Sequence, residues 1–386
     1  MRVLLFYITK ESGHHHASTA VEQALKQIAP SVHVKQVDAF TYTNPVLARI
    51  INQTYMGVLK TRPELWEYLY DNPKLIRRIR SLRDVIHRYN SAKFKALMEA
   101  ARPDVVACTQ AFPCGMVADF KATYRPHIPL VAVLTDYAPH SYWVFDEVDA
   151  YVVASATARD RLMAHGVAED RIKMFGIPID PHFGQPMPAN PRDAAQPPLI
   201  LLMGGSTGFG PLREMVQTLE RCAAPFRLHV IAGHNRALYR WCMKRRGALE
   251  HQLTVSAHED QVWSLMRRAA LLITKPGGLT TAEALAVGLP MIMINPIPGQ
   301  EAQNAEYVLR HAAAVRARDA DEVALLAEEL LRNSGKRQHM RQAALQASHP
   351  HAAANTARFL LELHQPSAVS AWLSPTARTV LVNSSR

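Results

Sequence analysis

Two glycine-rich turns in the second half of the chain have the composition of phosphate-binding loops. The first covers residues 204–210, follows the apolar run 199–203, and precedes Pro211, which suits the first turn of a helix. Glycines let the backbone approach a phosphate closely, and the free N–H groups at a helix start attract its charge. The turn has neither the GxGxxG order nor the Lys-Ser/Thr ending of a Walker loop. We therefore expect it to bind a phosphate, with a plain strand-to-helix turn as the alternative.

The second glycine-rich turn, residues 275–278, follows the apolar run 271–274. Thr280 and Thr281 are good N-cap residues, so a helix is expected to start there. Glu283 would then lie in the first turn of that helix. There it could complete a capping box, or its carboxylate could accept hydrogen bonds from the two hydroxyls of a ribose.

A third polar turn, residues 296–304, stands at another predicted helix start after the apolar run 291–294. Its side chains Gln300, Glu301 and Asn304 could form hydrogen bonds with the hydroxyls of a sugar. Taken alone, the segment also fits an ordinary turn.

The first half of the chain offers groups that could move a proton. Three consecutive histidines begin at His14, but no carboxylate or cysteine spacing completes a metal site around them. A neutral imidazole is better suited to act as a general base. Asp136 and His140 follow the apolar run 130–134, and α/β proteins place reactive groups at the ends of such strands. A solvated helix start and a surface turn are the respective alternatives.

A basic amphipathic segment, residues 74–95, has apolar side chains at helical spacing among many lysines and arginines, including Arg77, Arg78 and Arg80. The preceding residues 55–70 are rich in aromatic and apolar side chains. Each Lys or Arg near an anionic bilayer contributes about 1 kcal/mol to binding, so the segment predicts contact with a lipid surface. A core-packed helix with a solvated face is the alternative.

Short apolar runs alternate with helical patterns along the chain, which predicts parallel sheets covered by helices. The alternation pauses at residues 178–198, where seven prolines predict a stiff linker. The expected organisation is a first domain over 1–177, the linker, a second domain over 199–365, and a tail over 366–386. Two such domains would face each other across a cleft, which is the expected ligand site.

The composition narrows the class of protein. The 386 residues exceed what one core usually holds, so two domains are the default. No apolar run approaches the roughly 18 residues of a spanning helix. The four cysteines form no CxxC pair, which fits reduced thiols in the cytosol. Lys and Arg number 44 against 33 Asp and Glu, so the net charge of +11 predicts an anionic partner. Neither zinc-finger spacing nor an RNA-recognition signature supports nucleic acid as that partner.

Together these segments resemble the monogalactosyldiacylglycerol synthases and the bacterial processive diacylglycerol glucosyltransferases. The resemblance covers residues 1 to about 365, and it is most specific over 273–284 and over 298–304. It implies a GT-B fold, with two Rossmann-like doubly wound domains. The first would bind a diacylglycerol or glycolipid acceptor, and the second a UDP-sugar.

The resemblance and the chemistry of the residues together give expected roles for individual residues. His14 and Asp136 would be catalytic, with His14 our first choice as the base that takes the acceptor's proton. The donor would be bound by Gly204, Gly205, Gly208, Lys275, Gly277, Gly278, Thr280, Glu283, Gln300, Glu301 and Asn304. The acceptor and membrane would be contacted by Gly13, Trp66, Arg77, Arg78, Arg80, His140 and Trp143. The family's glycine-rich N-terminal loop is reduced here to Lys10-Glu11-Ser12-Gly13.

The expected reaction is therefore inverting transfer of a hexose from UDP-glucose or UDP-galactose to a lipid hydroxyl. It would need no cofactor and no metal, and it would occur on the cytoplasmic face of the membrane, where the protein would be peripheral. Two alternatives share the fold: a peptidoglycan-type UDP-GlcNAc transferase with a membrane lipid acceptor, and a UDP-sugar epimerase. The first prefers a fuller glycine-rich N-terminal loop, and the second has no need of the basic and aromatic segments.

Overall fold

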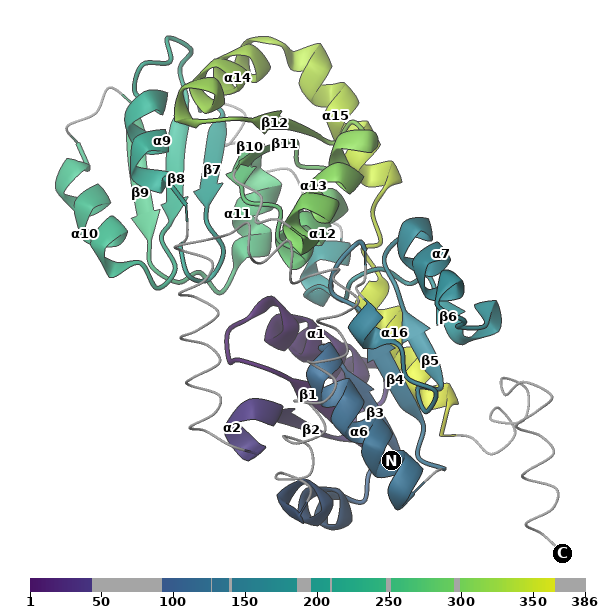
Figure 1. The fold of residues 1–386 in the computed structure, drawn as a ribbon. Coiled ribbons are helices and arrows are strands. Elements are labelled where there is room, and N and C mark those ends of the chain that lie inside the picture. Colours follow the sequence, from purple (N-terminus) through teal and green to yellow (C-terminus); the bar gives the residue numbers. More distant parts are fainter. Residues whose placement is uncertain are drawn as a thin grey trace, which may run out of the picture. The chain divides into compact units, whose positions relative to one another are not determined.

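The computed structural model describes residues 1–43, 92–125, 127–138, 141–185, 196–208, 210–247, 251–294 and 299–364. The chain forms two compact units. Unit 1 contains residues 1–181 together with the C-terminal residues from His351 onward, and unit 2 contains residues 182–350. Each unit is built around one parallel six-stranded sheet (Figure 1).

Unit 1 has the strand order β2-β1-β3-β4-β5-β6. The strands are β1 (Arg2–Tyr7), β2 (His33–Asp38), β3 (Val105–Cys108), β4 (Leu130–Val133), β5 (Ala150–Val152) and β6 (Ile172–Lys173). The helices are α1 (Gly13–Ile28), α2 (Ala39–Thr43), helical residues 92–101, α6 (Ala111–Thr123), α7 (Ala156–Ala164) and α16 (Ala352–Glu362). The short 3-10 turns of this unit are η1 (Ser141–Trp143) and η2 (Glu169–Arg171), and a third, η3 (Pro181–Gly184), spans the point where the chain passes from unit 1 to unit 2.

Unit 2 has the strand order β12-β11-β10-β7-β8-β9. The strands are β7 (Leu199–Met203), β8 (Arg227–Ile231), β9 (Gln252–Ser256), β10 (Ala269–Thr274), β11 (Met291–Ile294) and β12 (Ala314–Ala317). The helices are α9 (Leu212–Leu219), α10 (Arg236–Arg245), α11 (Val262–Arg268), α12 (Gly278–Ala286), α13 (Gln300–Arg310), α14 (Ala320–Arg332) and α15 (Ser334–Gln346). The expected doubly wound architecture is confirmed in both units.

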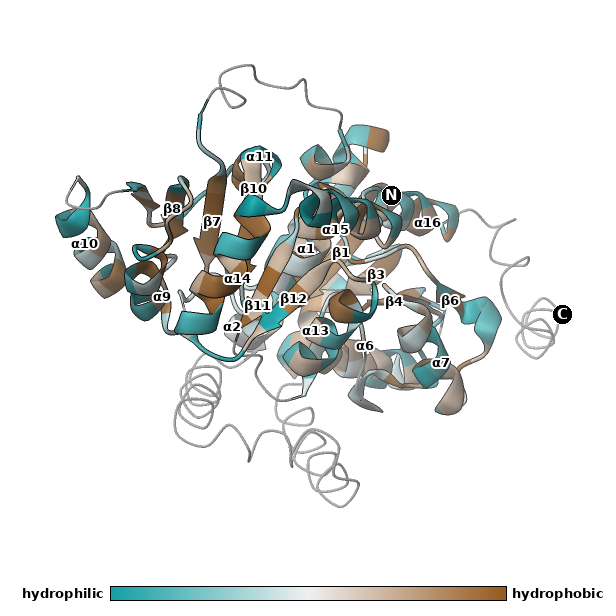
Figure 2. Cartoon of the chain, turned by 90° about the horizontal axis from the view of Figure 1, so that it is seen from above, coloured by the Kyte–Doolittle hydropathy of each residue, from teal (hydrophilic) through white to brown (hydrophobic). Residues whose placement is uncertain are grey.

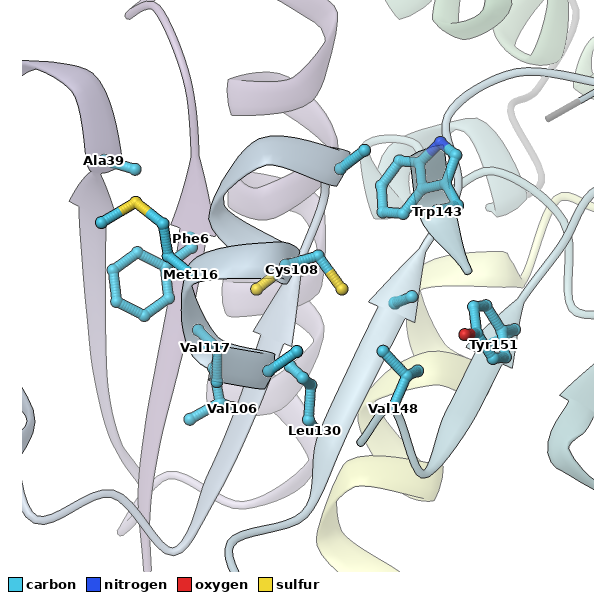
Figure 3. Packing of buried hydrophobic residues seen from close by; sticks show 14 of the residues in the cluster. Phe6, Ala39, Val106, Cys108, Met116, Val117, Leu130, Trp143, Val148 and Tyr151 are labelled. Atoms are coloured by element: carbon cyan, nitrogen blue, oxygen red, sulfur yellow. The ribbon is translucent and has the colours of Figure 1, made fainter. Parts of the chain in front are cut away.

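The central strands are apolar on both faces because helices cover both faces of each sheet. In β1, Val3 and Leu5 belong to the core beneath α1 and α16, whereas Leu4 and Phe6 belong to the core beneath α6. Figure 3 shows the second of these cores, with Phe6 beside Met116 of α6. Strand β7 is hydrophobic along its length, while the helices of its unit carry hydrophilic faces (Figure 2).

The C-terminal helix α16 packs against α1, so it belongs to unit 1. Its buried residues Ala353, Ala357 and Leu360 share a core with Ala20 and Ala24 of α1. This differs from the domain division expected from the sequence, which placed residues up to 365 in the second domain. An amphipathic pattern predicts that one face of a helix is buried, but it does not identify the surface that buries it.

Both sheets reverse their strand order at a defined point, and ligands of doubly wound sheets bind outside the carboxyl ends of the strands there. In unit 1 the reversal lies between β1 and β3, where Phe6 pairs with Cys108. In unit 2 it lies between β7 and β10, where Met203 pairs with Thr274. The fold therefore indicates two candidate ligand sites. One lies at the turns after β1 and β3, and the other at the turns after β7 and β10.

Candidate functional site

His14 lies at the reversal point of unit 1, in the first turn of α1. The helix is capped by Ser12, whose Oγ accepts a hydrogen bond from the backbone N–H of His15 at 3.2 Å. The backbone carbonyl of His14 accepts a hydrogen bond from Oγ1 of Thr109, the residue directly after β3, at 2.9 Å. The turns after β1 and β3 are thus tied together at His14.

The imidazole of His14 is held through its Nδ1 atom. Nδ1 lies 2.8 Å from the carbonyl oxygen of Thr109 and 2.9 Å from Oγ1 of Thr135. A carbonyl oxygen can only accept, so Nδ1 carries the proton and donates it to Thr109. In the neutral ring, Nε2 therefore keeps its lone pair, and no hydrogen bond to a described residue engages it. Burial lowers the pKa of His14 to about 4, so the ring is neutral at pH 7.

The turn after β4 contacts His14 through Thr135, and Asp136 is the next residue of that turn. Thr135, whose hydroxyl touches the His14 ring, directly precedes Asp136, whose side chain is partly exposed. A role for Asp136 in catalysis stays a prediction.

Trp143 is placed differently from the expectation of an acceptor or membrane contact. Its side chain is only 4% exposed and lies in the core with Val148 (Figure 3). The turn η1, which carries it, packs against α6. Because burial of the large indole is favourable, Trp143 serves the core and has almost no surface to offer a lipid.

Of the other residues predicted to contact the acceptor or the membrane, only Gly13 belongs to the described part of the chain. Gly13 is the exposed first residue of α1. His140, Trp66, Arg77, Arg78 and Arg80 lie outside the described residues. Among the described residues, no helix is both long and apolar enough to span a bilayer.

The glycine turn after β7 lies at the reversal point of unit 2. Gly205 and Gly208 have φ angles of +69° and +58°, a backbone conformation that favours glycine. A Cβ atom on Gly208 would lie 2.1 Å from the carbonyl oxygen of Ala232, so only glycine fits there. The turn is also bonded to the start of α10, since Nδ2 of the N-cap residue Asn235 donates to Gly208 O at 3.2 Å.

Lys275, in the second glycine-rich turn, contacts both the first glycine-rich turn and the third polar turn. Its Nζ lies 2.6 Å from Oε1 of Glu301 at the start of α13. Its Cε would lie 3.0 Å from a Cβ on Gly205, so the side chain lies along the first glycine turn. Lys275 and Gly204 also line a recess at the start of α9. Three segments predicted to bind the donor are therefore assembled around one cation.

Helix α12 begins earlier than the sequence suggested. It starts at Gly278 with Gly277 as its N-cap, and no side chain caps it. Glu283 consequently lies in the second turn, where it cannot complete a capping box with a threonine N-cap. The prediction that Thr280 or Thr281 caps the helix is wrong. Glu283 and Thr280 are partly exposed, so both side chains have surface that a ligand could reach.

Asn304 and Gln300 occupy different positions on α13. Asn304 is fully buried, and its Nδ2 donates to the carbonyl oxygen of Pro276 at 3.2 Å. It therefore supports the turn after β10 and presents no surface to a sugar in this structure. Gln300 is the first residue of α13 and is partly exposed.

Sequence reasoning assigned no role to Thr109, Thr135 or Asn235. The first two directly orient His14, and Asn235 bonds to the glycine turn. Their shared signal was a polar residue soon after a buried strand. Among the described residues, no group of three or more histidine, cysteine, aspartate or glutamate side chains could hold a metal ion.

Comparison with known proteins gives a match for each part of the chain. Residues 14–179 match the family model described as monogalactosyldiacylglycerol (MGDG) synthase, and residues 199–357 match the glycosyltransferase family 28 C-terminal domain. A processive diacylglycerol beta-glucosyltransferase from Bacillus thuringiensis is 29% identical over 372 residues, covering 94% of this chain and 93% of that protein.

Solved structures share the fold at low sequence identity. Acinetobacter baumannii MurG aligns with a TM-score of 0.61 at 13% identity, covering 94% of this chain and all of that one. The glycotransferase of kitacinnamycin aligns with a TM-score of 0.64 at 14% identity, covering 94% and 98%. At these identities the likeness establishes the fold alone, which is GT-B.

Proposed function

We propose that this chain, whose first part matches the monogalactosyldiacylglycerol synthase model and whose second part matches the glycosyltransferase family 28 C-terminal domain, transfers a hexose from a UDP-sugar to diacylglycerol or a related glycolipid. The observation that carries the proposal is the alignment of a named diacylglycerol glucosyltransferase over nearly the whole chain, so that both units are matched. UDP-glucose and UDP-galactose are the proposed donors.

Unit 2 is the proposed donor site. The backbone N–H groups of Gly204 and Gly205 would hold the diphosphate, and Lys275 beside them would offset its negative charge. Gly208 would shape the turn, since its own N–H donates to Gly205 O at 3.0 Å. Glu283 would accept hydrogen bonds from the ribose hydroxyls. The sugar would be contacted from the start of α13 by Gln300 and Glu301, with the backbone of Gly277 and Gly278 and the hydroxyl of Thr280 completing the site.

Unit 1 is the proposed acceptor site, and its base is His14. A lipid hydroxyl has a pKa far above neutral, so its attack on the anomeric carbon needs a group that removes its proton as the new bond forms. Nε2 of His14 would take that proton, because Nδ1 is already protonated and bonded to Thr109. The bond between the sugar and UDP breaks in the same step. UDP leaves with its charge stabilised by the glycine-turn amides and Lys275.

The transfer is proposed to invert the anomeric carbon. UDP-hexoses carry the sugar in an α linkage, and the relative from Bacillus thuringiensis is named a beta-glucosyltransferase. A β product from an α donor requires one displacement, or any odd number of them. A single base and a single attack, as proposed for His14, meet that requirement without a covalent intermediate.

The proposed acceptor is a membrane lipid, so the enzyme must work at a bilayer surface. We place that surface on the cytoplasmic side, where nucleotide sugars are made, and assign the anionic lipid contact to the basic segment around Arg77, Arg78 and Arg80. The reaction invokes no cofactor, since the UDP-sugar is itself a substrate.

The anomeric configuration of the product tests this mechanism. Purified protein would be incubated with UDP-glucose and diacylglycerol liposomes, and the product glycolipid would be examined by proton NMR. A β-linked glucosyl lipid is the expected result. An α-linked product would contradict single-displacement transfer.

A further inference from the structure

The turn between β1 and α1 adopts a backbone conformation that its residues do not favour. Thr9 and Glu11 have φ angles of +59° and +66°, although neither is glycine. Such conformations are unfavourable for residues other than glycine, and they persist only where surrounding contacts impose them. Contacts with other residues must therefore hold the backbone of Glu11 in the left-handed region, because a glutamate does not favour that conformation.

The contacts of His15 supply part of that restraint. The backbone N–H of Glu11 donates to Nδ1 of His15 at 3.2 Å. The His15 ring also packs against the ring of Tyr7, with the two ring centres 4.5 Å apart. Tyr7 is the last residue of β1, so His15 links the strained turn to the end of the strand. Burial and the nearby charge of Lys10 lower the pKa of His15, which keeps Nδ1 able to accept.

The same turn determines where His14 lies. Ser12 caps α1, its N–H bonds to Thr9 O at 3.1 Å, and its Oγ donates to Ile8 O at 2.8 Å. His14 follows two residues later, so a shift of the turn would move its ring relative to Thr109. His15, which accepts the hydrogen bond from the Glu11 N–H, is the residue directly after His14.

We propose that His15 is a positioning residue: by accepting the Glu11 N–H and packing on Tyr7, it holds a glycine-poor turn in the left-handed form that places His14 for catalysis. The proposal rests on the proposed function through the role of His14. It assigns His15 no contact with substrate. A side chain with an acceptor at the position of Nδ1 should replace it, and asparagine offers Oδ1 there.

Turnover of five proteins tests the proposal: the parent, His15→Ala, His15→Asn, Glu11→Gly, and Glu11→Gly with His15→Ala. His15→Ala should lower kcat about tenfold, since small misplacements of a catalytic group are costly, while the KM for the UDP-sugar stays unchanged. His15→Asn should retain most of the parental kcat. Glu11→Gly should make His15→Ala nearly harmless, because glycine adopts the turn without help. His33→Ala, which removes an exposed histidine of β2, is the matched control and should match the parent.

Two outcomes of the turnover measurements would overturn the proposal: equal losses of kcat in His15→Asn and His15→Ala, or an undiminished loss when Glu11→Gly is already present. Thermal unfolding of the same proteins keeps this inference separate from the proposed function. If the parent transfers no sugar, the function is wrong, but non-additive effects of Glu11→Gly and His15→Ala on stability are still expected. Additive effects would refute the restraint itself.

Discussion

Nδ1 of His14 lies 2.8 Å from the carbonyl oxygen of Thr109, a residue 95 positions away in the chain. The reversal of strand order between β1 and β3 brings the two turns together. Because the carbonyl fixes the proton on Nδ1, the contact leaves Nε2 as the basic nitrogen. The tautomer of the proposed base is thus set by a backbone carbonyl of the turn that follows the neighbouring strand.

Removal of the His14 imidazole should slow the transfer step without weakening the donor. His14→Ala is expected to lower kcat by about a hundredfold or more, in the range that a general base contributes. Steady-state kinetics would give kcat, and calorimetry would give the affinity for UDP, which should not change. His33→Ala again serves as the control for loss of a histidine in unit 1.

Asp136 provides the competing assignment for the base. If His14→Ala keeps near-parental turnover while Asp136→Asn is inactive, the two roles must be exchanged. If both variants remain active, the turn after β1 is only structural and the proposed chemistry fails.

The low pKa of His14 predicts the acid limb of the rate profile. The base works only when neutral, so kcat should stay level as pH falls through 6.5, the ordinary histidine value, and decline as it approaches about 4. Protonation of His14 should also lower the stability of the fold as pH falls. The unfolded chain takes up this proton near pH 6.5 and the folded chain only near pH 4, so the free energy of unfolding should decrease across that range. Circular dichroism at each pH would separate unfolding from titration. A half-maximal rate near 6.5 would exclude His14 in this environment as the base.

Gly208 should be irreplaceable in the donor site. Gly208→Ala would set a Cβ atom 2.1 Å from Ala232 O, so the turn must move. We expect UDP affinity to fall at least about tenfold, or roughly 1.4 kcal/mol, by calorimetry. Gly247→Ala is the control, because its φ of +87° is also left-handed but no atom lies within 4 Å of the added Cβ. Equal UDP affinity in the two variants would remove this turn from the phosphate site.

Binding to membranes should depend on the basic segment at residues 74–95. Replacement of Arg77, Arg78 and Arg80 by Glu is expected to cut cosedimentation with anionic liposomes and to leave UDP affinity intact. Added salt should weaken parental binding, since it screens surface charge over a Debye length of about 10 Å at 0.1 M. A triple variant that matches the parent on anionic and on neutral liposomes would argue against this contact.

Local patterns predicted much of the fold. The apolar run 199–203 forms β7 with the expected bounds, and Gly205, Gly208 and Gly210 after it adopt positive φ angles that their residue type permits. The alternation of strands and helices led to two doubly wound units, and strand ends pointed to His14 and to the donor turns. These features are encoded within a few residues of one another, where spacing and residue type are informative.

Contacts between distant segments could not be predicted in this way. Nothing near Thr109 in the sequence indicates that its carbonyl orients His14, and nothing in 352–362 indicates that α16 packs on α1. Trp143 illustrates the same difficulty, since an aromatic residue suits a core as well as a lipid surface. The positive φ angle of Glu11 could not be predicted either, because a glutamate normally adopts a negative φ angle.

The most direct test of the central claim is the identity of the product lipid. The purified full chain would be incubated with UDP-glucose, UDP-galactose or UDP-GlcNAc and liposomes containing diacylglycerol, and the lipids would be analysed by mass spectrometry with His14→Ala in parallel. We predict hexosyl diacylglycerol from UDP-glucose or UDP-galactose, and far less of it from the variant. Absence of any glycosylated diacylglycerol, with UDP-GlcNAc instead epimerised or transferred to a lipid-linked peptidoglycan precursor, would contradict the account.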